Sequence, residues 1–514
     1  MPKLRGAMVL GGALIALAAC AHVVTRQLTT PDQGATLDRK SPFLKAHLRS
    51  GYVYVLQSWS WNDSSGAVTG FGTLFDADRH GVGPPTAVRL PRDSVALFET
   101  NVSHVSGASI ALAVMTGVTA AVAIVCAANP KACFGSCPTF YAPDSSGNLL
   151  LQAEGFSASI APALEAVDLD ALYRARPASR DFSLRLTNEA LETHVIRYAD
   201  LLAAPRPPNG RVFAVSGGGF RQAATLTPPS LCSAAEGDCR AAVAAFDARE
   251  RFTPSDSNDL GARETIDLEF DHPPAGPLGL VVTARQSLMT TFLIYQALAY
   301  MGTDAGHWLA SLPATTPDSA RAESILGRLL GRIEVLVPDD GGGWRQVAET
   351  GETGPIAADT KIVPLPRLAA APVRVRLRLT KGLWRLDWLA LASLGDSVTP
   401  MRLAPHNVRR GTTSDSAALR ALTLRRDPLT TLPGDALDLD YRLPEHPESF
   451  ELFVETRGYY LEWMRREWMA ETNPRAAARL LFDPGGMLRE LAHPYKRQEA
   501  TADSLFWNSR YARR

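Results

Sequence analysis

The sequence lacks an excess of charge of either sign, since its 514 residues include 53 Lys and Arg against 53 Asp and Glu. A domain that binds nucleic acid usually presents a basic surface, so we expect no nucleic-acid partner. The 10 histidines are scattered and form neither His-x-His nor His-Glu-x-x-His. Because metal sites use such spacings, we predict no metal ion, and we predict no cofactor.

Global disorder is excluded by the composition, because 46% of the residues are hydrophobic and 21% are charged. These values are ordinary for a folded globular protein. The 39 glycines and 36 prolines favour many turns over long helices. A chain of this length has room for about three domains.

The N-terminus has the parts of a secretory signal peptide. Lys3 and Arg5 supply a charged start, and Ala7–Ala19 is uncharged and too short to span a bilayer. The run Leu-Ala-Ala-Cys that ends at Cys20 resembles the lipobox of bacterial lipoproteins. This resemblance implies cleavage before Cys20, acylation of its thiol and a membrane partner held through the lipid. Ala21 is compatible with the periplasmic face of the outer membrane, by analogy with enteric lipoproteins.

The remaining cysteines form two close pairs along the chain. In an oxidising compartment, Cys133 with Cys137 and Cys232 with Cys239 would each close a small loop as a disulfide. Cys126 would then remain as a buried thiol. The alternative is a metal site built from Cys126, Cys133 and Cys137. That site lacks a fourth nearby ligand and the Cys-x2-Cys spacing typical of zinc.

The segment from Lys131 to Tyr141 contains the string Cys-Phe-Gly-Ser-Cys-Pro-Thr-Phe-Tyr. This string is similar to one found in an uncharacterised family of bacterial envelope lipoproteins, for which no activity is established. Gly135 would permit the tight turn that a Cys-x3-Cys bridge needs. We therefore expect a disulfide-clamped turn, and the alternative is a redox-active cysteine pair.

Strand patterns dominate much of the chain. Between Gly51 and Thr100, four short segments alternate apolar and polar residues between turns, which predicts a small β-meander or barrel. Alternating segments between Ile333 and Leu391 predict a sandwich with a jelly-roll or galactose-binding-like pattern. The predicted fold class is mainly β, with a β-meander, β-sandwich or jelly-roll-like domains, one long apolar helix and a helical C-terminus.

The predicted long helix covers Ala108–Ala128, which has no charge and is long enough to cross a membrane. Only a minority of its residues are strongly apolar, so insertion would be marginal. One crossing would also place the later cysteine pair in the reducing cytoplasm. We favour a helix buried against protein, with a membrane span as the alternative. Two more helices are predicted at Tyr460–Glu471 and Arg475–Leu481.

One pattern recurs three times along the chain. Each copy opens as an alternating strand, bends at a polar residue and resumes with aromatic or β-branched residues, as strands do at the corners of β-sandwiches. Chance similarity of short strand patterns is the alternative. The copies are Leu184–Tyr198, Leu280–Tyr295 and Glu451–Arg465, with their bends at Asn188, Arg285 and Arg457.

These patterns divide the chain into successive segments. The segments are a signal peptide (1–19), a tether (20–50), a small β-meander (51–105), an apolar helix (106–130), a cysteine-clamped β-rich domain (131–265), a β-sandwich or jelly-roll-like domain (266–430), and a strand followed by a helical C-terminal region (431–514).

The sharpest enzymatic hypothesis is a serine hydrolase. Ser397 follows Gly395 and Asp396 after a predicted strand, as the nucleophile does in hydrolases of the Gly-Asp-Ser class. The base would have to be His493, in the sequence Glu-Leu-Ala-His. An α/β core between them is lacking, so a turn capped by Asp and Ser is the favoured interpretation and no catalytic residue is assigned.

Aromatic residues offer the remaining candidate site. Trp59 and Trp61 lie near the N-terminus, and Tyr459, Tyr460 and Trp463 lie near the C-terminus. Such side chains can stack on sugar rings, although β-sandwich cores use them too. They are therefore candidate ligand-facing residues, with a core role as the alternative.

Together, these patterns favour a lipid-anchored protein of the bacterial cell envelope that binds or scaffolds rather than catalyses. Its partner is expected to be an envelope protein or a glycan. The alternatives are an envelope hydrolase that uses Ser397, and a membrane-spanning component of an envelope transport or signalling assembly.

Overall fold

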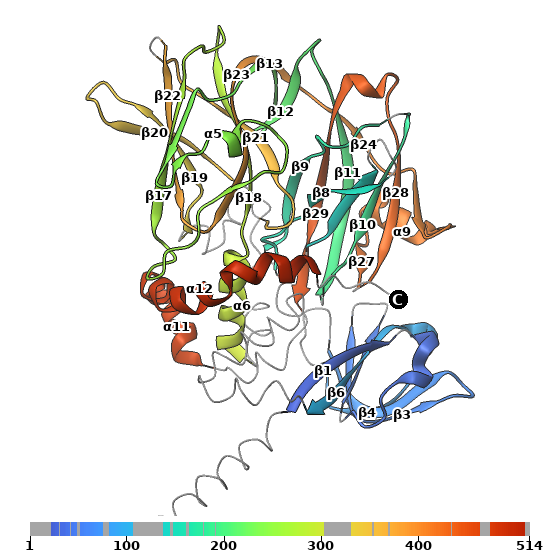
Figure 1. The fold of residues 1–514 in the computed structure, drawn as a ribbon. Helices are drawn as coiled ribbons and strands as arrows, with labels where there is room; N and C mark the ends of the chain where they lie inside the picture. The colour runs from blue at the N-terminus through green and yellow to red at the C-terminus, as the bar shows by residue number, and fades with distance from the viewer. Residues whose placement is uncertain are drawn as a thin grey trace, which may run out of the picture. The chain divides into compact units, whose positions relative to one another are not determined.

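A computed structural model describes most of the chain. The described residues are 22–29, 31–41, 43–48, 52–75, 82–105, 137–143, 148–160, 164–177, 179–190, 192–302, 330–351, 354–368, 371–432, 434–462 and 473–508. The chain divides into two compact units, Met1–Ile124 and Val125–Arg514. Both units are built mainly from antiparallel strands (Figure 1), so the predicted mainly β class is confirmed.

The first unit contains one six-stranded sheet with the order β1-β6-β2-β3-β4-β5. Of the strands predicted as a meander, β3, β4 and β5 are successive neighbours in this sheet, whereas the last, β6, pairs with β1 and β2 and not with β5. Residues 22–48, which belong to the segment predicted as a tether, supply two further strands that gain their hydrogen bonds from β6 and β3. The bounds are β1 His22–Thr29, η1 Pro31–Thr36, β2 Leu44–Leu48, β3 Val53–Asn62, β4 Ala67–Phe75, β5 Thr86–Pro91, η2 Arg92–Ser94 and β6 Val95–Val105.

The second unit begins with a sandwich of two sheets, ordered β26-β25-β28-β10-β7-β8 and β24-β11-β29-β9, with β27 paired to β11. Phe140, Leu184, Ile196, Leu439 and Val454 are among the buried side chains of its core. The bounds are β7 Thr139–Pro143, β8 Leu149–Glu154, β9 Ala166–Ala171, β10 Asp181–Thr187, β11 Glu192–Pro205, β24 Met401–Leu403, β25 Asn407–Arg410, β26 Thr413–Ser414, α9 Ser416–Leu424, β27 Leu429–Thr431, β28 Ala436–Arg442, η5 Pro447–Ser449 and β29 Phe450–Glu462.

A second sandwich is built from the segment between β11 and β24. Its sheets are ordered β13-β12-β21-β18-β23-β16 and β15-β14-β17-β22-β19-β20. Because β13 pairs with both β12 and β23, five strands of the first of these sheets close into a ring. The bounds are β12 Arg211–Val215, β13 Phe220–Thr227, β14 Leu231–Ala234, β15 Gly237–Asp238, α5 Arg240–Val243, β16 Arg251–Phe252, β17 Arg263–Phe270, β18 Leu278–Gln286, β19 Ile333–Pro338, β20 Trp344–Thr350, β21 Asp359–Pro364, β22 Val373–Thr380 and β23 Trp384–Val398.

The first sandwich is therefore assembled from two segments that are distant in sequence. β10 pairs with β28 and β11 pairs with β29, so residues from both sides of the second sandwich share its sheets. The sequence had divided the strands of this sandwich among three successive segments, 131–265, 266–430 and 431–514. Strand pairing is not limited by sequence distance, which is why linear patterns did not predict this arrangement.

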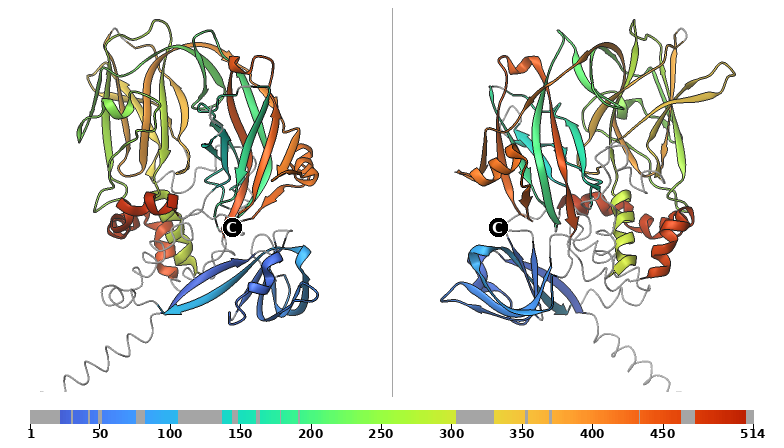
Figure 2. Two further views of the ribbon diagram at one scale, coloured as in Figure 1. Left: turned by 45° about the vertical axis from the view of Figure 1, so that its right-hand side comes forward. Right: turned by 180° about the vertical axis from the view of Figure 1, so that it is seen from behind.

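A shared apolar cluster joins the two sandwiches. Leu202 and Phe453 of the first sandwich pack in one cluster with Phe213, Ile362 and Trp388 of the second. The sandwiches lie side by side in both views of Figure 2. Burial of several large side chains at about 1.5–3 kcal/mol each favours a fixed contact between them.

Three helices lie beside one end of the second sandwich: α6 (Met289–Met301), α11 (Pro474–Phe482) and α12 (Pro484–Asn508). Both C-terminal helices contact α6, and Phe292 of α6 lies 5.2 Å from Tyr495 of α12 between ring centroids. The helix predicted at Arg475–Leu481 is confirmed as α11. α12 was not predicted, because Pro484, two glycines and Pro494 read as helix breakers.

Three of the sequence predictions for these segments are wrong. Leu280–Tyr295 was expected to resume as a strand after Arg285, but the chain enters α6 instead. The third copy of the pattern runs through Arg457 as one strand, β29, so the three copies do not share a bend. Tyr460 to Glu462, predicted as helix, also belong to β29. Apolar periodicity alone does not separate a short buried helix from a strand.

The long apolar helix predicted for 106–130 falls outside the described residues. Among the residues that the structure describes, no long apolar helix is found, and none has the length and apolar character needed to cross a membrane.

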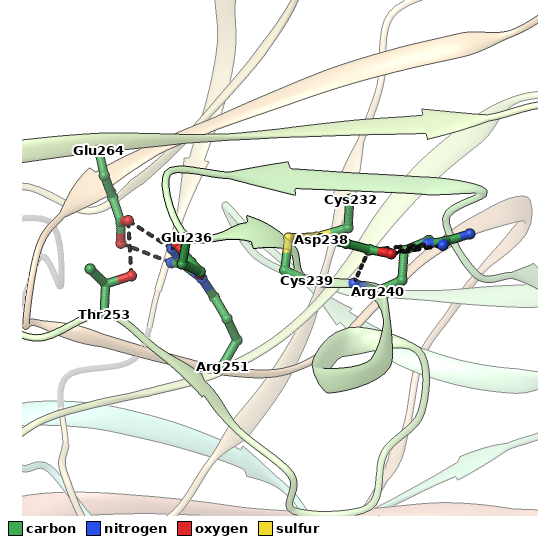
Figure 3. Close-up of a disulfide and its surroundings, with 8 residues drawn as sticks. All are labelled: Cys232, Glu236, Asp238, Cys239, Arg240, Arg251, Thr253 and Glu264. Carbon is green, nitrogen blue, oxygen red and sulfur yellow. Dashed lines mark hydrogen bonds and ion pairs between the residues drawn. A yellow bond between two sulfur atoms is a disulfide. The ribbon is translucent and has the colours of Figure 1, made fainter.

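A disulfide joins Cys232 to Cys239, as predicted, and clamps the β14–β15 hairpin (Figure 3). Near it, Arg251 reaches two carboxylates. Its Nη2 lies 2.7 Å from Glu264 Oε2, and its Nε lies 2.6 Å from Glu236 Oε1. The hairpin is therefore held covalently, and the nearby arginine is neutralised by acidic residues.

Candidate functional site

A pocket of about 260 Å³ lies where the two sandwiches meet. We call it the junction pocket. It is lined by residues of β8, β9 and the loop after β9 on one side, and by residues of three segments of the second sandwich on the other. The lining residues are Leu151, Gln152, Ala171, Tyr173, Arg174, Phe246, Ala248, Glu250, Arg285, Ile356, Ala357 and Ala358.

Gln152 places a polar group in the wall of the junction pocket without a protein partner. The residue is 6% exposed, and its buried amide Nε2 has no hydrogen-bond partner in the protein. An unsatisfied buried donor costs about 1–3 kcal/mol, so such a group requires an explanation. A bound ligand that accepts its hydrogen bond would remove that cost.

Arg174 is held in place mainly by an aromatic ring. Its guanidinium lies 4.8 Å from the ring centroid of Phe246. Its nearest acid is Asp387, at 3.7 Å between Nη2 and Oδ2, which is longer than a hydrogen bond. The Arg174 side chain is 37% exposed, whereas the Asp387 side chain is 1% exposed. The guanidinium therefore keeps N–H donors that a ligand can use.

Asp387 organises the loop that carries Phe246 and Ala248. Its Oδ1 accepts the backbone N–H groups of Asp247 and Ala248, at 3.3 and 2.9 Å. Burial raises the pKa of Asp387, while these two hydrogen bonds and Arg174 act in the opposite direction. Ala248 has a φ of 67°, which is uncommon for a residue with a side chain. Such conformations often occur at functional sites.

The second arginine of the junction pocket is fully paired. Arg285 donates from Nε and Nη2 to both carboxylate oxygens of Glu250, at 2.5 and 2.7 Å, and from Nη1 to the carbonyl oxygen of Pro355 at 2.7 Å. Arg385 adds a longer contact to Glu250 at 3.7 Å. This ion pair fixes one wall and leaves Arg174 as the pocket arginine with the weaker acidic partner.

The aromatic floor of the junction pocket is part of the shared cluster. Tyr173 makes edge contacts with Phe213, Phe246 and Phe453, and its hydroxyl donates to the carbonyl oxygen of Val212 at 2.7 Å. Burial raises the pKa of Tyr173 well above its usual value. The tyrosine therefore stays neutral and fixes the floor rather than exchanging protons.

These features give the junction pocket the properties of a binding site. Its lining is largely apolar, with a small number of polar residues, which is the usual composition of small-molecule sites. Within the described part of the chain, no group of three His, Cys, Asp or Glu residues could hold a metal ion. The available chemistry is donation of hydrogen bonds from Gln152 and Arg174.

The proposed hydrolase pair is not assembled. Ser397 is exposed near the end of β23, where it pairs with Arg221. His493 is exposed on α12, which packs against α6. The chain enters α6 after Gln286 of β18, which pairs with Trp384 at the start of β23. Ser397 lies near the other end of β23, roughly 40 Å along the strand from Trp384. The helices and Ser397 are therefore at opposite ends of β23, and Ser397 and His493 cannot act as nucleophile and base.

The two N-terminal tryptophans pack on the core of the first unit. Trp59 donates from Nε1 to the carbonyl oxygen of Ser41 at 3.3 Å, and Trp61 lies edge-on to Phe98 at 5.9 Å between ring centroids. Both are half-buried against the core cluster. Their packing favours the core role that was the alternative to a ligand-facing one.

The C-terminal aromatics do not form a common platform in the described residues. Tyr460 is 6% exposed and belongs to the core of the first sandwich, where its hydroxyl donates to the carbonyl oxygen of Ser157 at 2.9 Å. The prediction that Tyr460 faces a ligand is therefore wrong, because its strand points this side chain between the sheets. Tyr459 is half-buried on β29, and Trp463 lies outside the described residues.

Cys137 differs from its predicted state. It is a free thiol, buried in the core of the first sandwich, whereas the sequence predicted a bridge to Cys133. Burial raises the pKa of the Cys137 thiol well above its usual value. Cys20, Cys126 and Cys133 lie outside the described residues.

No sequence pattern identified the residues of the junction pocket. Gln152, Arg174, Glu250 and Arg285 come from four separate segments of the chain. None of them belongs to a motif with a characteristic spacing. Only the contact between the two sandwiches brings these side chains to one space, so an inspection of local patterns could not find them.

The fold and the pocket define a class of protein: a mainly β protein whose two sandwiches enclose a small pocket between them. No protein-family model matches the chain, and no curated protein is similar to it.

Two solved structures show weak similarity. The cycloalternan-forming enzyme from Listeria monocytogenes, in complex with pentasaccharide substrate, has a TM-score of 0.17 and 9% identity over 69% of this chain and 29% of that chain. The dimeric latent PorU from Porphyromonas gingivalis has a TM-score of 0.13 and 9% identity over 96% of this chain and 40% of that chain. The chain thus spans less than half the length of either protein, and neither similarity defines a family.

Proposed function

We propose that this protein is a lipid-anchored component of the bacterial cell envelope that binds a ligand or partner without catalysing a reaction. The observation that carries the binding role is the junction pocket, where Gln152 presents a buried donor without a protein partner. The lipobox-like sequence ending at Cys20 supports anchoring in the envelope, with the periplasmic face of the outer membrane as the favoured location. The Cys232–Cys239 disulfide is consistent with an oxidising compartment.

The anchor can be tested by fractionation of the native host. The wild-type protein should incorporate a clickable palmitate analogue and sediment with membranes, whereas Cys20→Ser should lose the label and leave the membrane fraction. Cys137→Ser is the matched control, because it removes a cysteine outside the lipobox. A wild-type protein without label would contradict the lipid anchor.

The binding role can be tested by chemical crosslinking in intact cells, followed by mass spectrometry of the proteins retained with the anchored chain. A reproducible neighbour would support a scaffold role, and its crosslinked peptides would identify the contacting sandwich. If neither a neighbour nor a glycan is retained above background, the binding role is contradicted.

A second candidate is a membrane-spanning component of an envelope assembly. It depends on the uncharged segment Ala108–Ala128. Cysteine-accessibility labelling on both sides of the inner membrane would distinguish it, because a span would make residues after this segment accessible from the cytoplasm.

A further inference from the structure

We infer that the junction pocket binds the carboxylate group of a small organic acid, with Arg174 pairing with the carboxylate and Gln152 donating a hydrogen bond to the same ligand. This inference rests on the proposed binding function and specifies its ligand chemistry. It assigns different roles to the two arginines of the pocket.

The junction pocket contains a hydrogen-bond donor that lacks an acceptor in the protein. Gln152 is 6% exposed and its Nε2 has no hydrogen-bond partner, although it lines the cavity. The acidic residue of the lining, Glu250, already binds Arg285 through both oxygens. The ligand therefore has to supply an acceptor for the Gln152 donor.

Arg174 selects for a planar anion. Its guanidinium carbon lies 4.8 Å over the Phe246 ring, and the 3.7 Å separation from Asp387 leaves the hydrogen-bonding capacity of the guanidinium incompletely used. An arginine fork binds a carboxylate through two parallel N–H···O bonds, which are stronger than bonds between neutral groups. Arg285 has no such capacity left, because Glu250 and Pro355 occupy its Nε, Nη1 and Nη2.

The rest of the pocket limits the size and polarity of the ligand. Its volume of about 260 Å³ is below the range of about 300–1,000 Å³ that holds drug-sized molecules. Alanine, leucine, isoleucine and aromatic side chains make up most of the lining. An acid of about the size of an amino acid or a monosaccharide fits both properties, and either an aliphatic acid or an acidic sugar could supply the carboxylate.

The test compares each acid with its neutral counterpart on the purified full chain. Dissociation constants for isovalerate and isovaleramide, and for glucuronate and glucose, are measured by saturation-transfer NMR titration. We expect at least one acid to bind about tenfold more tightly than its neutral counterpart, a difference of about 1.4 kcal/mol, because only the acid forms a charge-assisted pair with Arg174. The pair that shows the difference distinguishes an aliphatic acid from a sugar acid.

Variants connect that preference to the two residues. Arg174→Gln should reduce the preference for the acid about tenfold or more, and Arg174→Lys should retain part of it through charge without the fork. Gln152→Met keeps the length of the side chain and should weaken binding severalfold by removing the donor. Arg180→Gln is the matched control, because Arg180 is an exposed arginine with a 3.7 Å contact to Glu445 and is not in the pocket lining. Circular dichroism melting verifies that each variant is folded.

Three results would overturn the inference. One is equal binding of the acid and its neutral counterpart, which contradicts carboxylate recognition but leaves a binding function in place. Another is equally tight binding of inorganic phosphate, which contradicts selection for a planar carboxylate. A third is the absence of binding by all the probes, and the in-cell crosslinking experiment then decides separately whether the protein binds a partner elsewhere.

Discussion

Arg251 and Glu264 form a buried bidentate ion pair in the second sandwich. Nη1 lies 2.8 Å from Oε1 and Nη2 lies 2.7 Å from Oε2, and both side chains are 3% exposed. Thr253 donates a further hydrogen bond to Glu264 at 3.0 Å. The charges are therefore compensated inside the protein rather than by water, and Arg251 has a second acidic partner in Glu236, at 2.6 Å.

The first prediction concerns this pair. Glu264→Gln should lower the free energy of unfolding by about 1.5–3 kcal/mol, because it removes a buried charge-assisted pair while Glu236 continues to compensate the guanidinium of Arg251. Urea denaturation followed by tryptophan fluorescence measures the change. Arg240→Gln is the control, since it disrupts the exposed pair with Asp238 and should leave the midpoint unchanged. Equal effects of the two substitutions would contradict the role of burial.

The second prediction is a pH dependence set by Asp440. Arg409 binds both of its oxygens at 2.8 Å and lowers the pKa of this carboxyl below its usual value of 3.8. A depressed folded-state pKa stabilises the folded protein above pH 3.8, and this contribution is lost as the pH falls through the lower folded value.

Unfolding free energies of the wild type and Asp440→Asn should therefore differ most near neutral pH and converge at acidic pH. Urea titrations at a series of pH values would measure this. The exposed Asp427→Asn is the control. A difference that stays constant down to pH 2 would show that the substitution acts through packing and not through ionisation.

The third prediction concerns the Cys232–Cys239 disulfide. Its sequence separation of 7 closes a short loop, so its loss should reduce stability by about 2–3 kcal/mol through the entropy of the unfolded chain. Replacement of both cysteines by serine should lower the melting temperature. Reductant should lower that of the wild type by a similar amount and have no further effect on the double variant. A wild type insensitive to reductant would contradict a stabilising bridge.

The fourth prediction distinguishes the observed Cys137 thiol from the expected bridge to Cys133. Burial and the raised pKa of the thiol suppress the reactive thiolate, so iodoacetamide should not label Cys137 in the folded protein. In urea without reductant, mass spectrometry should find it labelled. Labelling that requires reductant would restore the predicted disulfide.

Strand alternation predicted the parts of the fold that depend on local pattern. The meander from β3 to β5 and the hairpin closed by Cys232 and Cys239 join neighbouring segments, so short-range turns and periodicity were sufficient. The segment after Arg285 was misassigned because the apolar residues of α6 fit a strand as well as a buried helix. Tertiary packing against α11 and α12 decides between them.

The sequence by itself determined that this is a mainly β chain without a charge bias, with one correctly paired disulfide and a lipobox-like N-terminus. These properties depend on composition and on residues that are close along the chain. Only the tertiary structure decided that β11 pairs with β29, although the strands of the second sandwich lie between them in the sequence. It also decided that Gln152 and Arg174 line one pocket with Arg285. The physical reason is that burial of apolar surface rewards contacts without regard to sequence distance, so a site built from distant segments leaves no local pattern.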